Sequence, residues 1–318
     1  MSAALRAGFI GLGDMGGAIV TRLLAAGLPV TLWARRPESL RQFDSGRFHA
    51  AASPAELGRH SDVVGICVFA DADVRQVVLG PDGVLAGLSW GSVLLIHSTV
   101  SVATCREIAA QAARVGVAVI DAPVTGARAR ALAGDLVVLL GGEAAAIEKA
   151  RPVLAAFAGT TAHLGPLGSG QRMKALNNAL GNATGRLASM AIEVGAQLGL
   201  DVGWVTEILR TGSAASAPMT SMVERLMRDP EFADLAARMI VKDTALFREM
   251  CAEAGVEAGV LEELAGERAE YIVPVLGGSA GGTPAKAGEG RPGRTRLRVA
   301  EPGRGDPHES LELMLARL

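Results

Sequence analysis

Glycines near the amino terminus have the spacing of a phosphate-binding turn. Residues 11–16 read GLGDMG, which fits the pattern G-x-G-x-x-G, and they lie between an apolar run and a helix-like segment. In this context the first glycine permits a tight turn, the second lets a pyrophosphate approach the main chain, and the third allows close helix packing. A sharp turn that binds no ligand is the alternative. The predicted cofactor-binding residues here are Gly11, Leu12, Gly13, Met15 and Gly16.

The choice between NAD and NADP depends on the residues that follow the second apolar run. An acidic residue at this point would bind the ribose 2′-hydroxyl of NAD. The chain instead reads Leu-Trp-Ala-Arg35-Arg36-Pro over residues 32–37, without a carboxylate. A guanidinium suits a 2′-phosphate, so we predict that NADP is preferred over NAD. Alternatively, Arg35 stacks on the adenine and tolerates either cofactor.

Lys174 could perform acid–base chemistry, with Asn178 orienting the lysine or the hydroxyl group on which it acts. They are four residues apart in a helix-like segment, so they share one helix face. When a hydride leaves a carbinol carbon, the hydroxyl proton needs an acceptor, and a lysine of lowered pKa can accept it. On spacing alone, an ordinary exposed lysine is the simpler interpretation.

An alternation of strands and helices must position these residues. Gly16–Ala26, Pro37–Phe43, Ala72–Leu79 and Val102–Val115 are predicted helices, and Ser53-Pro54 marks another helix start. This alternation implies a parallel sheet covered on both faces. Buried strands are predicted at Ala7–Ile10, Val30–Trp33, Val63–Phe69, Ser92–His97, Gly116–Ile120 and Leu136–Leu140.

The second half of the chain is predicted to be helical, followed by a disordered tail. We divide the chain into a dinucleotide-binding domain (1–166), an all-α domain (167–276) and a Gly/Pro/Arg-rich tail (277–318). A basic cluster in the tail is expected to be solvated rather than to bind nucleic acid. Helices are predicted at Gly170–Leu200, Val202–Thr211, Met219–Met227, Phe232–Gly255 and Glu257–Tyr271.

Four motifs in order give a family resemblance over about residues 7–262. They are GFIGLGDMG, the Ser98-Thr99 pair, DAPVTGA at 121–127 and GSGQRMKALNN at 168–178. The chain resembles the beta-hydroxyacid dehydrogenases, the group of 3-hydroxyisobutyrate dehydrogenase and tartronate semialdehyde reductase. The resemblance implies an α/β fold, with a Rossmann-type doubly wound parallel sheet, followed by an all-α domain joined by a long helix. It also implies NAD(P)-dependent hydride transfer between nicotinamide and a beta-hydroxy acid or its semialdehyde, at a site between the domains.

The resemblance assigns roles to further residues. It implies that Lys174 is the general acid/base and that Asn178 orients the lysine or the substrate hydroxyl. Thr125 and Gly126 stand where the family holds the substrate carboxylate, and Thr99 stands where it approaches the nicotinamide ribose. The lysine of a later K-D pair, expected near the cofactor, is Lys242, for which a surface ion pair with Asp243 or Glu249 is the alternative.

The chain departs from the family pattern beside the expected carboxylate site. Ala127 replaces a glycine, and Arg128 and Arg130 replace small residues, which leads us to expect a larger or more anionic acid. Imine reductases share the architecture, but they usually carry Asp or Tyr at the position of Lys174. A non-catalytic NADP-binding protein is the other alternative, and nothing in such a protein would require Lys174 and Asn178.

Composition and charge limit the expected partners and compartment of the protein. The net charge of −2 gives no general reason to expect nucleic acid or a membrane surface as a partner. Three separated cysteines and the lack of a signal peptide or long apolar segment favour a cytoplasmic protein. The histidines show no metal-ligand spacing, so we predict no metal, and we interpret His97 as structural. From the glycine-rich face of the long helix and from the family, we expect a homodimer or homotetramer.

Overall fold

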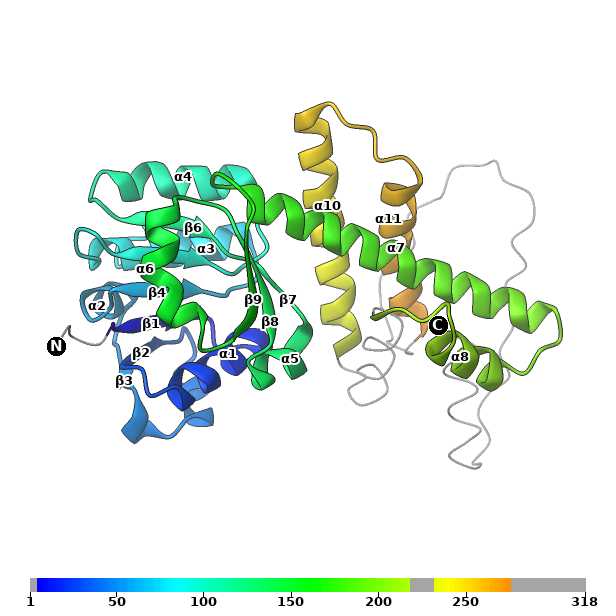
Figure 1. Cartoon of the computed structure of the whole chain (residues 1–318), viewed down its shortest axis with the longest axis horizontal. Coiled ribbons are helices and arrows are strands. Elements are labelled where there is room, and N and C mark those ends of the chain that lie inside the picture. The colour runs from blue at the N-terminus through cyan, green and yellow to red at the C-terminus, as the bar shows by residue number, and fades with distance from the viewer. Residues whose placement is uncertain (1–4, 218–231, 276–318) are drawn as a thin grey trace. The chain divides into compact units, whose positions relative to one another are not determined.

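Figure 1 shows the protein as a computed structural model, which describes residues 5–217 and 232–275. The chain divides into two units. The first contains Met1–Asn177 and Leu246–Val256, and the second contains Asn178–Ala245 and Glu257–Leu318. The helix predicted at Met219–Met227 and the tail predicted at 277–318 lie outside the described residues.

Six parallel strands form the larger sheet of the first unit. Across the sheet they follow the order β3-β2-β1-β4-β5-β6, so the chain builds outward from the centre in one direction and then in the other. This order confirms the predicted doubly wound parallel sheet, and it places a topological switch point between β1 and β4. The strands are β1 (Ala7–Ile10), β2 (Val30–Trp33), β3 (His49–Ala50), β4 (Val63–Ile66), β5 (Val93–Ile96) and β6 (Ala118–Asp121).

Both faces of this sheet are buried. Because successive strand residues point to opposite faces, Phe9 and Leu95 enter one apolar cluster while Ile10 and Leu94 enter another. The first cluster contains residues of α1 (Asp14–Ala25) and α6 (Ala144–Leu154). Burying each such side chain contributes roughly 1.5–3 kcal/mol, and this explains the unbroken apolar runs of the strands. The second cluster includes residues of α2 (Pro54–Arg59), α3 (Asp71–Leu79) and α4 (Val102–Ala113).

A second, three-stranded sheet corrects one prediction. Leu136–Leu140, expected in the parallel sheet, forms β8, which pairs antiparallel with β7 (Val124–Thr125) and parallel with β9 (Ala158–His163). The chain turns back between β7 and β8 through the short helix α5 (Ala127–Ala133), which ends at Gly134 in the left-handed conformation with φ of 74°. This reversal accounts for the antiparallel pairing of β7 and β8.

Other differences from the predicted elements are local. Pro37–Phe43 was expected to be an α-helix but forms a 3-10 helix, η1 (Pro37–Gln42), which ends because Phe43 has an extended backbone. Two further 3-10 turns occur at η2 (Ser45–Arg47) and η3 (Val84–Ala86). The predictions omit β3, β7, β9, α5 and α6, most of which are short or exposed.

Helices form all of the described secondary structure after β9, as predicted. The long helix α7 (Ser169–Gln197) starts in the first unit and continues into the second. Just after its end, Gly199 has a φ of 76°, a left-handed conformation that favours glycine. In the second unit, buried Arg268 donates to the carbonyl of Gly185 at 2.9 Å, and a Cβ at Gly185 would crowd that guanidinium. The remaining helices are α8 (Val202–Thr211), α10 (Phe232–Ala254) and α11 (Val260–Val275).

No helix in the described part of the chain combines the length and apolar character needed to cross a membrane.

Candidate active site

Several predicted site residues follow the carboxyl ends of parallel strands. Gly11 follows β1, Arg35 follows β2, and Thr99 lies just beyond β5. The last residues of the three central strands are in register, with Ile10 paired to Ile66 and Ile66 paired to Ile96. The loops that follow these strands therefore lie together at the carboxyl-terminal edge of the sheet, beside the switch point between β1 and β4. Ligands of open α/β sheets bind at such a point.

The glycine turn has the geometry that a bound pyrophosphate requires. Gly11 has φ of +96°, and a Cβ there would overlap the carbonyl oxygen of Cys67. A Cβ at Gly16 would overlap the carbonyl oxygen of Gly11, so these two glycines are needed for packing. A Cβ at Gly13 would meet nothing within 4 Å, and Gly13 begins α1 without a side-chain cap. Open space beside the amino-terminal end of a helix at this point fits a dinucleotide phosphate.

The side chains of Leu12 and Met15 pack against the apolar core. Leu12 is buried, so only its backbone groups can serve the turn.

Arg35 and Arg36 are both exposed just after β2. The Arg35 side chain is 73% exposed, and its Nη1 lies 3.4 Å from the Asp73 carboxylate. Because this ion pair is long and solvated, it holds the guanidinium weakly.

The buried carboxylate of Asp121 anchors the start of α7. Its Oδ1 accepts the N–H of Gly168 at 2.6 Å, and its Oδ2 accepts the N–H of Gln171 at 2.7 Å. By accepting these two hydrogen bonds, the carboxylate satisfies amide N–H groups that the helix itself leaves unpaired. Burial raises the pKa of the Asp121 carboxyl, and the N–H donors partly offset that effect. The end of β6 therefore fixes where the long helix begins.

Gln171 holds the backbone on both sides of Thr99. Its side chain is fully buried, and its Nε2 donates to the carbonyl of Ser98 at 2.9 Å. The N–H of Val100 donates to its Oε1 at 3.2 Å. From the first turn of α7, the side-chain amide of Gln171 thus holds the residues before and after the half-buried Thr99. Sequence reasoning missed this role, because only the tertiary contact reveals it.

The next turns of α7 carry Lys174 and Asn177, and Asn177 contacts the predicted carboxylate-binding loop. Lys174 is half-buried and lies three residues after Gln171, on the same helix face. Three residues further, the Asn177 amide approaches the Thr125 hydroxyl at 3.5 Å, a long hydrogen bond. Asn177 was not singled out in the sequence, although it is the first asparagine of the K-x-x-N-N motif.

The loop after Thr125 has an unusual backbone. Gly126 has φ of +131°, and Ala127 has φ of +59°, a conformation that strains a residue with a Cβ. The two following arginines are paired within the protein. Arg128 donates to the carbonyl of Asp14 at 2.9 Å, which links this loop to the glycine turn. Arg130 pairs with Asp135 at 3.0 Å.

Two predicted residues belong to the second unit, where a carboxylate joins them. The Asn178 amide donates to Asp243 at 2.6 Å, and Lys242 pairs with the same carboxylate at 3.0 Å. The ion pair matches the alternative interpretation of Lys242 as a partner of Asp243.

His97 lies within the core of the first unit. Its Nδ1 pairs with the carbonyl oxygen of Ala122 at 2.8 Å, and its ring stacks on Phe9 at 5.9 Å between centroids. Burial lowers the pKa of His97 to about 4. The neutral ring supports its interpretation as a structural histidine.

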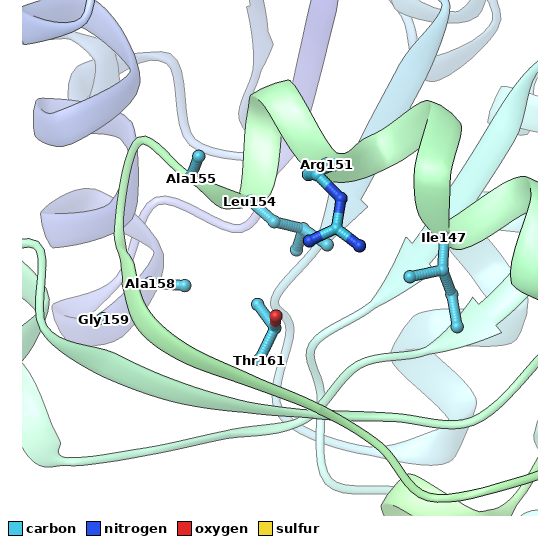
Figure 2. A pocket seen from close by; sticks show the side chains of 7 residues that line it. All are labelled: Ile147, Arg151, Leu154, Ala155, Ala158, Gly159 and Thr161. Carbon is cyan, nitrogen blue, oxygen red and sulfur yellow. The ribbon is translucent and has the colours of Figure 1, made fainter.

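Figure 2 shows a pocket of about 120 Å³ on α6 and β9. Arg151 and Thr161 line it, and none of the predicted site residues does. Its lining therefore offers no link to the glycine turn or to Lys174.

Comparisons with known families match both halves of the chain. Residues 6–165 match the family described as the NAD binding domain of 6-phosphogluconate dehydrogenase. Residues 168–282 match the family described as NAD-binding of NADP-dependent 3-hydroxyisobutyrate dehydrogenase. Together the two matches include the glycine turn, Thr125 and Lys174.

Curated relatives and solved structures agree with these matches. A probable mitochondrial 3-hydroxyisobutyrate dehydrogenase-like protein 3 of Arabidopsis thaliana is 36% identical over 259 residues, which cover 81% of this chain and 80% of the relative. An NAD-dependent L-serine dehydrogenase of Pseudomonas aeruginosa is 32% identical, over 76% of this chain and 83% of the relative. The structure of a Mycobacterium tuberculosis 3-hydroxyisobutyrate dehydrogenase with L-serine superimposes with a TM-score of 0.73 at 26% identity, over 85% of this chain and 94% of the other. The chain thus belongs to the beta-hydroxyacid dehydrogenase family and is an NAD(P)-dependent oxidoreductase that acts on CH–OH groups.

Proposed function

We propose that the protein transfers a hydride between NADP(H) and a beta-hydroxy acid or its semialdehyde, with Lys174 as the general acid/base. The contact between Asn177 and Thr125 carries this proposal. Asn177 lies one helical turn from Lys174, which supports a position of the expected carboxylate-binding loop near the lysine. A carboxylate bound at that loop would position the neighbouring hydroxyl near the lysine.

Each residue then has a defined task. The Thr125 hydroxyl and the Gly126 N–H donate to the substrate carboxylate, while Asn178 orients the lysine or the hydroxyl. Lys174 Nζ accepts the hydroxyl proton during oxidation and returns it during reduction. The glycine turn, Thr99 and Lys242 hold the dinucleotide, whose nicotinamide supplies the hydride chemistry. In this proposal residues 1–166 are the NAD(P)-binding domain and residues 167–276 are the all-α substrate and dimerisation domain.

The preference for NADP rests on Arg35 and Arg36. Both are exposed after β2, no carboxylate precedes them on residues 32–34, and the Asp73 pair leaves Arg35 weakly held. Arg35→Ala should raise the KM for NADP and leave the KM for NAD nearly unchanged. An unchanged KM for NADP would remove the basis for this preference.

The proposed homodimer or homotetramer is supported by an apolar stripe on α7. Large apolar side chains recur at helical spacing on this helix and are 45–60% exposed: Leu176, Leu180, Leu187 and Val194. Light scattering on the purified protein should give a mass of two or four chains, and a monomer at micromolar concentration would contradict the proposal.

A substrate panel tests the activity. Beta-hydroxy acids, their semialdehydes and a cyclic imine are assayed with NAD and NADP, with Lys174→Ala beside the wild type. Loss of the acid/base should lower kcat about 10²- to 10⁴-fold. Arg172→Ala is the matched control, because it removes an exposed cation from the same turn of α7. Turnover of the imine alone, or full activity in Lys174→Ala, would overturn the proposal.

A further inference from the structure

Two histidines and a glutamate gather at the edge of the larger sheet, away from the residues assigned to catalysis. His49 starts β3, the edge strand, while Glu56 lies on α2 and His60 is the residue that ends this helix. One donor atom from each side chain lies within 4.8 Å of the other two. We propose that these three residues form a binding site for a divalent transition metal, with Zn²⁺ as the metal that fits best.

The chemistry of the donors favours zinc. Two imidazoles and a carboxylate are typical zinc ligands, and three protein ligands leave a fourth position for water. Donors placed tetrahedrally at about 2.1 Å from zinc are about 3.4 Å from one another. His49 Nε2 and Glu56 Oε1 already lie 3.4 Å apart. The third donor, on His60, lies within 4.8 Å of these two atoms, so metal binding requires it to move closer through a side-chain rotation.

The local fold prepares the three ligands. Glu56 and His60 are four residues apart, so the helix places them on one face. The N–H of Ala52 donates to Glu56 Oε2 at 2.7 Å, which orients the carboxylate and directs Oε1 toward His49. Orientation of a ligand by a second hydrogen bond is characteristic of metal sites.

The site is accessible and separate from the proposed chemistry. His49 and His60 are exposed, and their rings lie 4.7 Å apart between centroids. β3 pairs with the middle of β2, through Thr31 and Leu32, rather than with the residues that follow β2. The sequence did not indicate this site, because one ligand comes from a strand and two from the helix that follows it.

Calorimetric titration of the full-length, untagged protein with Zn²⁺ tests the proposal. The protein is first treated with a chelator and kept reduced. The wild type should bind one equivalent of Zn²⁺, and binding should raise the midpoint of thermal unfolding, since the ligand binds only the folded site. His49→Ala and His60→Ala should each lower the affinity at least tenfold, and Glu56→Gln should lower it without changing the helix. His163→Ala is the control, because His163 lies on β9.

Co²⁺ identifies the ligands directly. Binding at this site should give the visible d–d absorption of a four-coordinate ion with nitrogen and oxygen ligands. The circular dichroism of each variant verifies that it folds. The proposal is overturned if the wild type does not bind Zn²⁺, if the histidine variants bind like the wild type, or if a thiolate-to-cobalt band shows that cysteine is the ligand.

Discussion

Replacing Gly13 by alanine should separate nucleotide binding from folding. A Cβ at this position meets no protein atom within 4 Å, so the folded chain accommodates it. Since Gly13 begins α1, exchanging glycine for alanine at the helix cap costs at most about 1 kcal/mol of unfolding free energy. The added methyl group instead occupies the space that a pyrophosphate would need.

The expected loss of affinity follows from the hydrogen bonds that the methyl group prevents. A backbone N–H that donates to a charged phosphate oxygen contributes about 1.5–3 kcal/mol. The loss of one such bond raises Kd about 10- to 150-fold, at 1.4 kcal/mol for each factor of ten. Titration of NADPH fluorescence gives Kd for both proteins, and urea denaturation gives the free energy of unfolding.

Gly16→Ala provides the matched contrast. Its Cβ would overlap the carbonyl oxygen of Gly11, so this variant should lose about 2 kcal/mol or more of stability. If Gly13→Ala bound NADPH with the wild-type Kd, or lost more stability than Gly16→Ala, the assignment of roles within the turn would be wrong.

Three further predictions concern the first unit. Gln171→Leu leaves the carbonyl of Ser98 and the N–H of Val100 unpaired in the core, so the free energy of unfolding in urea should fall by about 2–5 kcal/mol. A fall of less than about 1 kcal/mol would show that Gln171 does not hold the backbone on both sides of Thr99. Ala127→Gly removes the backbone strain at φ of +59°. The greater entropy of glycine in the unfolded chain offsets part of this gain, so the free energy of unfolding should rise by up to about 1 kcal/mol. A fall in the free energy of unfolding would argue against strain at this residue. His97 has a folded pKa of about 4, below that of an unfolded histidine, so the unfolded state binds the extra proton and stability should fall by roughly 2 kcal/mol from pH 7 to pH 5. His97→Phe should remove that part of the pH dependence, and an unchanged slope would show that another group causes it.

The larger sheet and the glycine turn were predictable from local pattern. Buried parallel strands are apolar at every position, so β1, β4 and β5 stand out as short runs between helices. β9 was missed because four of its six residues are exposed and its sequence, AGTTAH, has no apolar pattern. β3 has only two residues, and its pairing with β2 depends on the neighbouring strand rather than on its own sequence.

The candidate site also has features that the sequence predicts and features that only the structure reveals. The motifs identified Lys174, Thr125 and the glycine turn as candidates, because the family motifs have such residues at fixed spacing. The contacts that position them join residues far apart in the chain, as Gln171 does with Ser98 and Asn177 with Thr125. Sequence spacing carries no information about such pairs.

The most direct test of the central claim is the turnover of Lys174→Ala in the presence of added methylamine. The substrate is the beta-hydroxy acid that the wild type oxidises fastest, and NADPH binding to the variant is measured in parallel. If Lys174 accepts the hydroxyl proton, the variant should bind NADPH normally, lose about 10²- to 10⁴-fold in kcat, and regain activity in proportion to the neutral amine. A variant that oxidises the acid at the wild-type rate without added amine would contradict the account.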